Sequence, residues 1–184
     1  SVARWRNVYV VKHAINRPAS PDDFDLSIVL GEHAVAVRGF WFGRLGQTVR
    51  CVPWRRTMYA VLGSETLYAK LYRRRKRAAA VEWHWLHMLP LLGFESAQPI
   101  AWLADRHASL IVTASVKGRS LDAWIVDAAA EGWLGDVFGY ACREVAPFAR
   151  RLHGQGLIHR DLNCSHLFAT NPRSAGRPAV IDVE

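Results

Sequence analysis

The hydrophobic pattern of the chain changes its period near residue 73, and this change constrains the fold more than any other feature. Before it, short runs rich in β-branched and aromatic residues alternate with turn residues such as Gly63-Ser64, which is typical of an antiparallel meander. These predicted strands cover residues 26–30, 34–38, 49–52, 57–62 and 66–72. After it, apolar residues recur at steps of three and four up to Gly93, which predicts a helix over residues 73–92. Its buried face is predicted to hold Ala78, Val81, Trp85, Met88 and Leu92.

The rest of the chain is predicted to be mainly helical. The expected elements are strands at residues 100–103 and 110–114, helices at 121–130 and 138–153, and short strands at 157–158, 167–168 and 179–181. The buried face of the longer helix is predicted to hold Ala141, Val145, Phe148, Ala149 and Leu152. This order of elements predicts an α+β fold. We expect a peripheral segment (1–25), a sheet-rich part (26–114) and a helical part (115–184).

The composition favours a globular protein with anionic partners. The 184 residues carry a formal net charge of +8, which favours phosphorylated or otherwise anionic partners but also fits a solvated basic surface. The three cysteines, Cys51, Cys142 and Cys164, are odd in number and lack metal-ligand spacing, so we expect neither a disulfide scaffold nor a zinc site. With no long apolar run, a cytoplasmic protein is the simplest expectation.

The strongest local signal lies between residues 152 and 163. A predicted helix ends in a glycine-rich turn, an apolar pair follows, and His159-Arg160-Asp161 opens a polar loop. A short apolar run then ends at Asp182, about twenty residues later. The triplet alone would suit a capped turn with a surface ion pair. The triplet together with the correctly spaced Asp182 favours a catalytic site.

This arrangement resembles the catalytic core of the protein-kinase superfamily. The resemblance implies ATP and Mg²⁺ as cofactors and a two-lobed kinase-like fold. Asp161 would accept the proton of the substrate hydroxyl or orient it, and Asp182 would bind the magnesium ion. His159 and Arg160 belong to the same catalytic loop, where His159 is expected to brace the loop.

The same resemblance assigns residues of the sheet-rich part. Lys70 lies in the middle of a predicted strand and would hold nucleotide phosphates, and Glu82 on the next helix would pair with it. Two other interpretations stay open, a solvated Lys70 and a Glu82 that pairs with a basic residue of its own helix. By analogy, Ser115 and Val116 would meet the adenine edge, with Thr113 behind it.

The residue five positions after Asp161 narrows the resemblance. Ordinary protein kinases have Asn at this position as a second magnesium ligand, whereas this chain has His166. In having His here, the chain resembles the Kdo and heptose kinases of lipopolysaccharide synthesis. The role of His166 is open, because imidazole is a poor magnesium ligand. The resemblance places His166 among the cofactor-binding residues, with Asn163 as an alternative polar partner. A glycine-rich phosphate loop is not evident. Gly43 and Gly46 are the nearest candidates, and a plain hairpin turn explains them as well.

Five consecutive basic residues open the predicted helix. They are Arg73, Arg74, Arg75, Lys76 and Arg77. Cations are slightly unfavourable at a helix start, so an anionic sugar-phosphate or lipid surface at the inner face of the membrane is one explanation, and a solvated face is the other. No nucleic-acid-binding motif supports a nucleic acid partner.

These features together predict an ATP-dependent kinase that phosphorylates a sugar hydroxyl of an anionic, lipid-linked glycan. A protein or small-molecule kinase of the same fold is the first alternative, since a fold does not determine the acceptor. A catalytically inactive pseudokinase that serves as a binding module is the second. It gains weight because only Val183 and Glu184 follow Asp182, so the second lobe is expected to be truncated and an inactive chain stays open as an alternative. The retained Lys70, Glu82, Asp161 and Asp182 favour an active kinase.

Overall fold

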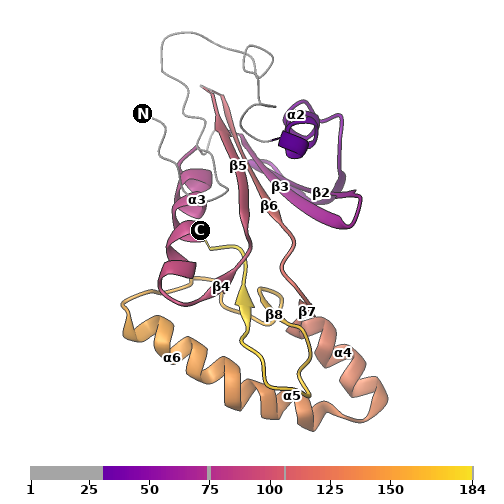
Figure 1. Ribbon diagram of the computed structural model, residues 1–184, viewed down its shortest axis with the longest axis vertical. Helices are drawn as coiled ribbons and strands as arrows, with labels where there is room; N and C mark the ends of the chain where they lie inside the picture. Colours follow the sequence, from indigo (N-terminus) through magenta and orange to yellow (C-terminus); the bar gives the residue numbers. More distant parts are fainter. Residues whose placement is uncertain (1–30, 74–75, 106, 184) are drawn as a thin grey trace. The chain divides into compact units, whose positions relative to one another are not determined.

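The computed structural model describes residues 31–73, 76–105 and 107–183, and the chain divides into two compact units (Figure 1). The first unit comprises Ser1–His87 and Gln98–Ser115, and the second comprises Met88–Ala97 and Val116–Glu184. The peripheral segment 1–25 and the predicted strand 26–30 lie outside the described residues. The limits predicted for the sheet-rich and helical parts remain predictions.

A five-stranded antiparallel sheet forms the first unit. Its order is β1-β2-β3-β6-β5. The strands are β1 (Gln47–Val52), β2 (Arg55–Leu62), β3 (Glu65–Arg73), β5 (Pro99–Ala104) and β6 (Ala108–Ala114). Paired residues of neighbouring strands share a face of the sheet, so the register sorts every side chain to one face or the other.

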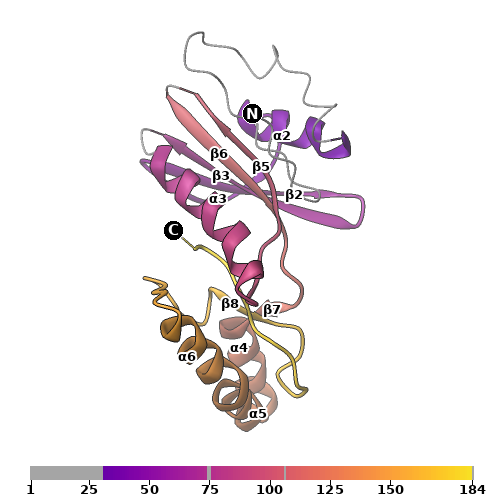
Figure 2. The ribbon, with the colours of Figure 1, turned by 60° about the vertical axis from the view of Figure 1, so that its left-hand side comes forward.

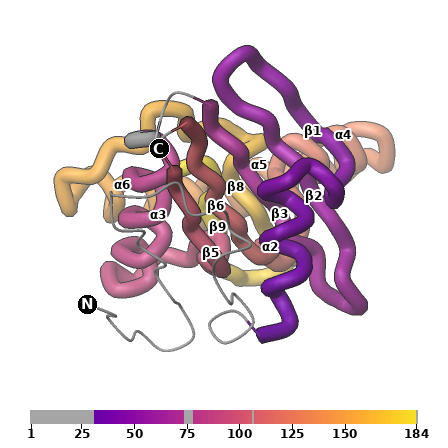
Figure 3. Tube along the Cα trace, turned by 90° about the horizontal axis from the view of Figure 1, so that it is seen from above, coloured from indigo at the N-terminus to yellow at the C-terminus, as the bar shows by residue number. Residues whose placement is uncertain are grey.

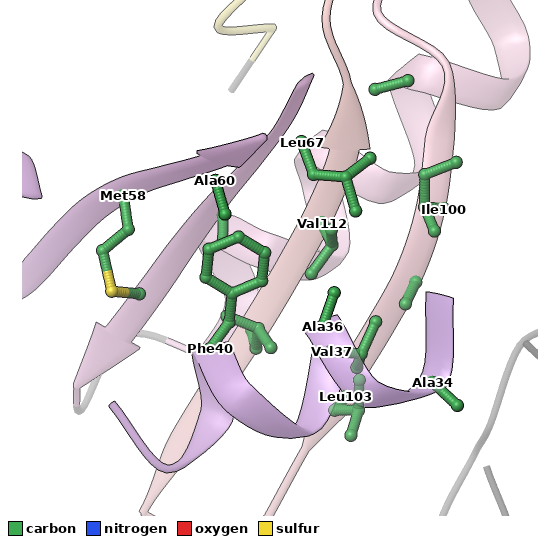
Figure 4. Close-up of a cluster of buried hydrophobic side chains, with 14 residues drawn as sticks. Ala34, Ala36, Val37, Phe40, Met58, Ala60, Leu67, Ile100, Leu103 and Val112 are labelled. Carbon is green, nitrogen blue, oxygen red and sulfur yellow. The ribbon is translucent and has the colours of Figure 1, made fainter. Parts of the chain in front are cut away.

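One face of this sheet packs against helix α2 (Ala34–Trp41), which follows a short 3-10 turn, η2 (Gly31–His33). Val37 and Phe40 of α2 are fully buried and lie over Met58 and Leu67 of the sheet (Figure 4). The sequence prediction of a strand at 34–38 is therefore wrong. Its apolar residues also fit a helical step of three, and burial of Val37 and Phe40 against the sheet favours the helix.

Helix α3 (Lys76–Leu91) lies on the opposite face of the sheet from α2 (Figure 2). The predicted helix is confirmed, but its predicted buried face is wrong, since Val81 is 43% exposed. The buried residues are Ala79, Glu82, Trp83, Leu86 and Leu89. The helix carries large apolar residues on several sides, so periodicity alone allowed two faces, and contact between Glu82 and the sheet selects one of them.

The second unit combines helices with a small sheet of order β4-β9-β8-β7. The helical segments are α4 (Leu121–Glu131), α5 (Leu134–Tyr140), the π-helical turn η3 (Ala141–Val145) and α6 (Ala146–Gly154), and the last three run on from one another (Figure 1). The strands are β4 (Glu95–Ser96), β7 (Arg119–Ser120), β8 (Leu167–Ala169) and β9 (Ala179–Val180). The predicted small strand at 157–158 is wrong, because these residues have no strand partner and Ile158 is 80% exposed.

Gly118 shows how tightly β7 is approached by β8. Its φ is +90°, and a Cβ atom there would lie 2.2 Å from the carbonyl oxygen of Ala169. Only glycine avoids this contact with backbone. Among the described residues, no helix has both the length and the apolar character needed to cross a membrane.

Candidate active site

Lys70 and Glu82 form a hydrogen-bonded ion pair in the first unit. Lys70 Nζ lies 2.5 Å from Glu82 Oε1, and the two side chains are 12% and 3% exposed. The hydroxyl of Tyr72 donates to the other carboxylate oxygen, Oε2, at 3.0 Å. A buried carboxylate is tolerated when it is paired and hydrogen-bonded in this way. Glu82 is thus held by two residues of strand β3, and Lys70 is held in turn by Glu82.

The register of the sheet explains which side chains accompany Lys70. Lys70 pairs with Thr57 on β2 and with Ile111 on β6, so these share its face. One row away, Tyr68 pairs with Tyr59 and with Thr113. The rings of Tyr59 and Tyr68 lie 6.0 Å apart, and Tyr68 is 39% exposed. An accessible aromatic pair therefore lies beside Lys70.

The connection that leaves β6 begins next to this aromatic row. The backbone N–H of Ser115 donates to the carbonyl oxygen of Thr66 at 2.8 Å, which extends the β3–β6 pairing beyond the strand. That N–H is therefore committed to the sheet. The roles predicted for Ser115 and Val116 at an adenine edge stay predictions.

The two glycines considered as a phosphate loop precede strand β1. Gly43 and Gly46 lie in the turn between α2 and β1, so neither is part of the β1–β2 hairpin. Gly46 has φ +99°, and a Cβ atom there would lie 2.7 Å from the Phe40 ring and 3.1 Å from Met58 Cβ. The structure thus gives Gly46 a packing role under helix α2.

In the second unit, His159 ties the polar loop to the end of strand β9. Its Nδ1 accepts from the backbone N–H of Asp161 at 3.2 Å, so Nε2 carries the ring proton of the neutral imidazole. Nε2 then donates to the carbonyl oxygen of Ile181 at 3.0 Å. Both ring nitrogens are used in backbone hydrogen bonds, and His159 joins the backbone of Asp161 to the residue that precedes Asp182.

The carboxylate of Asp161 is oriented and yet accessible. Asn163 Nδ2 donates to Asp161 Oδ1 at 2.8 Å, and Asn163 Oδ1 accepts from the backbone N–H and the hydroxyl of Ser165. The Asp161 side chain is 71% exposed. An exposed carboxylate held at one oxygen can accept a proton or a hydrogen bond at the other. Arg160, its neighbour in the triplet, is exposed.

His166 lies between the two aspartates. Its Nδ1 lies 2.8 Å from the carbonyl oxygen of Asp161 and 3.5 Å from Asp161 Oδ2. A carbonyl can only accept, so Nδ1 carries a proton, and Nε2 faces Asp182 Oδ2 at 3.4 Å. The backbone of His166 also accepts from the N–H of Ile181. The loop and the end of β9 are thus connected through both histidines.

Asp182 has an unusual backbone. Its φ is 58°, and it is the one residue other than glycine with positive φ in the described part of the chain. Asp tolerates this left-handed conformation better than most residues, but at a cost. Such conformations occur often at functional sites, where the surrounding structure maintains them.

The donor set around His166 fits a magnesium ion that binds together with a nucleotide. In the described ranges, no three His, Cys, Asp or Glu side chains are arranged to hold a metal ion by themselves. Mg²⁺ is commonly bound by one or two carboxylates, with waters and substrate phosphates as its other ligands. Asp182, with Asp161 on the other side of His166, provides such carboxylates.

Several residues of these two sites were not identified from the sequence. Tyr68 and Tyr72 could have been found from strand alternation, because each is two residues from Lys70. Pairing of Tyr59 with Tyr68 depends on the register of β2, which the sequence does not reveal.

Comparisons with known proteins give one family, from a family model, and one fold, from solved structures. The model of the lipopolysaccharide kinase (Kdo/WaaP) family matches residues 33–184. The solved structure of WaaP in complex with acyl carrier protein is similar at a TM-score of 0.60 and 20% identity, over 80% of this chain and 68% of that one. Rad53 (1–466) in complex with AMP-PNP is similar at a TM-score of 0.52 and 19% identity, over 76% of this chain and 37% of that one. No curated protein sequence matches. The predicted α+β, protein-kinase-like fold is confirmed.

Proposed function

The chain belongs to the lipopolysaccharide kinase (Kdo/WaaP) family and is a lipopolysaccharide core kinase that uses ATP, and from this premise we propose which residues carry the transfer and what they act on. Asp161 orients the acceptor hydroxyl and takes its proton. Asp182 binds magnesium. Lys70, held by Glu82, binds the nucleotide phosphates. The acceptor is a sugar hydroxyl of an anionic, lipid-linked glycan.

The observation that carries this proposal is the state of the Asp161 carboxylate. One oxygen is held by Asn163, and the side chain is 71% exposed. A general base must reach the proton that it takes, so exposure and fixed orientation are both required. His159 fixes the backbone of the same residue.

Asp182 supports the metal part of the proposal. A magnesium ion, when bound, neutralises the charge of the nucleotide phosphates. His166 holds Asp161 and Asp182 at hydrogen-bond or near hydrogen-bond distance on its two sides. His166 is therefore a positioning residue in this proposal.

The acceptor part rests on charge as well as on the family. Lipopolysaccharide core sugars and their lipid anchor are anionic, and the chain has a formal net charge of +8. Residues 74 and 75 of the basic run lie outside the described residues, so the proposed contact with a membrane surface rests on the sequence.

The test is transfer of labelled γ-phosphate from ATP to a purified lipopolysaccharide core saccharide. Asp161→Asn is expected to lower kcat by about 100-fold or more with little change in ATP affinity. Asp182→Asn is expected to lower kcat similarly and to weaken the dependence of ATP binding on Mg²⁺. A wild-type rate retained by Asp161→Asn would refute the assignment of the base. Transfer to a protein acceptor in preference to the saccharide would refute the assignment of the acceptor.

A further inference from the structure

The β1–β2 hairpin of the first unit has an unusual composition. Between Gln47 and Leu62 it contains three arginines, no acidic residue and no glycine. The turn at its tip is Pro53-Trp54. Proline lacks a backbone N–H, and a bulky residue cannot take the conformations by which glycine lets backbone amides surround a phosphate. If this hairpin binds an anion, it does so with side chains.

The register of the hairpin places one of these arginines beside Lys70. Arg50 pairs with Thr57, and Thr57 pairs with Lys70, so the three side chains share a face and a row of the sheet. Neighbouring strands lie about 4.8 Å apart, which puts the Cα atoms of Arg50 and Lys70, two strands away from each other, about 10 Å apart. Strand β1 is an edge strand of the sheet (Figure 3), and Arg50 in this strand is exposed. Two long cationic side chains thus approach the same surface from either side of a threonine.

A second arginine stands in the next row on the same face. Arg55 pairs with Tyr72 of β3, and its guanidinium carbon lies 6.0 Å from the centre of the Tyr72 ring. Tyr72 is the residue that donates to Glu82, the partner of Lys70. Arg55 is therefore packed against the group that holds the Lys70–Glu82 pair, and it adds positive charge at that place.

The third arginine lies on the other face. Arg56 Nε donates to Thr48 Oγ1 at 2.8 Å, and Thr48 pairs with Met58, which packs under α2. A Cβ atom on Gly43, at the end of α2, would lie 3.7 Å from an Arg56 nitrogen. Arg50 and Arg56 therefore have the same charge in the same hairpin but lie on opposite faces.

We propose that Arg50, with Arg55 beside it, binds the phosphate chain of the nucleotide through guanidinium groups, in place of a glycine-rich backbone loop. The inference rests on the proposed function, since it takes Lys70 as a phosphate ligand. Guanidinium groups bind phosphate oxygens through two parallel N–H donors. The base then lies toward Tyr68 and Thr113, one row away from Lys70, and the phosphates lie toward the tip of the hairpin.

The test compares Arg50→Gln with Arg56→Gln in the full chain. The dissociation constants of ATP, ADP, AMP and adenosine are measured by calorimetry for wild type and both variants. Arg50→Gln is expected to weaken ATP binding about tenfold, ADP binding less, and adenosine binding less than twofold. Arg56→Gln, the matched control, is expected to stay within twofold of wild type for all four. Adenosine binding also reports that Arg50→Gln is folded.

The outcomes separate this inference from the proposed function. If wild type binds ATP and Arg50→Gln leaves the ATP-to-adenosine affinity ratio unchanged, Arg50 does not contact the phosphates and the inference is wrong. It is equally wrong if both arginine variants weaken ATP to the same extent, because the effect is then that of net charge. If wild type binds no nucleotide, the proposed role of Lys70 as a phosphate ligand is wrong, and the inference that rests on it is wrong as well.

Discussion

His166 Nε2 lies 3.4 Å from an oxygen of Asp182. The other ring nitrogen of His166 donates to the carbonyl oxygen of Asp161, so one imidazole ring contacts both aspartates. Removal of His166 should loosen both of them without removal of either carboxylate. We expect His166→Ala to lower kcat by about 10- to 100-fold, the range typical of residues that orient ligands. His166→Asn, which keeps a donor and an acceptor, should retain more activity. Equal losses of kcat in the two variants would contradict this role.

The Lys70–Glu82 pair should matter for stability as well as for binding. Because Glu82 is 3% exposed, Lys70→Met leaves a buried carboxylate without its cation, and we expect a loss of about 3–5 kcal/mol in the free energy of unfolding. The double variant Lys70→Met/Glu82→Gln removes both charges and should recover most of that stability. Urea unfolding of the two single variants and the double variant measures the coupling. ATP binding should not recover in the double variant, because the phosphate ligand is gone.

Substitutions of Asp182 test whether its left-handed backbone conformation lowers the stability of the protein. Its φ of 58° is easily adopted by glycine and is tolerated by asparagine, but it is unfavourable for alanine by about 1 kcal/mol. We therefore expect Asp182→Gly and Asp182→Asn to unfold at denaturant concentrations at or above that of Asp182→Ala. All three should lose transfer activity. An Asp182→Ala protein more stable than the glycine variant would show that the backbone is not under strain there.

The proximity of Asp161 and His166 could be predicted from the sequence because their contacts are local, while their catalytic roles stay predictions. Asp161 and His166 are five residues apart, and the chemistry of each residue type limits its role. The Lys70–Glu82 pair could also be predicted from the sequence, because strand alternation indicates the face of Lys70 and the helix has one acidic residue.

Contacts that depend on long-range register could not be predicted in the same way. The position of Arg50 beside Lys70 depends on a register shift between Thr48 and Arg50 in β1, and no local pattern reports it. The buried face of α3 was missed for a related reason. Its residues include apolar side chains on several sides, and the contact of Glu82 with Lys70 selects the face. Tertiary contacts thus decided what periodicity left open.

Substitutions at Gly46 and Gly43 test whether these glycines serve the packing of the protein or the binding of phosphate. At Gly46 a new Cβ would press on the Phe40 ring at 2.7 Å, with φ at +99°, so Gly46→Ala should destabilise the protein by about 2–4 kcal/mol. At Gly43 the nearest atom is a flexible Arg56 nitrogen at 3.7 Å, and Gly43→Ala should cost about 1 kcal/mol. Neither variant should change the affinity for ATP when measured below its unfolding midpoint. A specific loss of ATP affinity in Gly43→Ala would indicate that these glycines contact the nucleotide phosphates.

Tyr140 should give the protein a distinct response to alkaline pH. Burial, followed by the nearby charges of Glu144 and Glu95, raises the pKa of Tyr140 to about 12 from its usual value of 10.0. The folded protein therefore keeps this proton at pH values where the unfolded chain releases it. Stability from this group is fully present below pH 10 and is lost as the pH rises from about 10 to about 12. We expect a loss of about 1–2 kcal/mol over that window, once solvent screening is allowed for.

Tyr140→Phe provides the control for this pH response. The variant loses the hydrogen bond from the Tyr140 hydroxyl to the carbonyl oxygen of Gly176, so it should be about 1 kcal/mol less stable at pH 8. The difference between wild type and variant should then shrink or reverse between pH 10 and pH 12, because phenylalanine has no proton to lose. Urea unfolding of both proteins at pH 8, 10 and 11.5 measures this difference directly. Lysine and arginine titrate in both proteins and cancel in the comparison. A difference that stays constant from pH 8 to pH 11.5 would mean that the Tyr140 hydroxyl ionises as readily in the folded protein as in the unfolded chain.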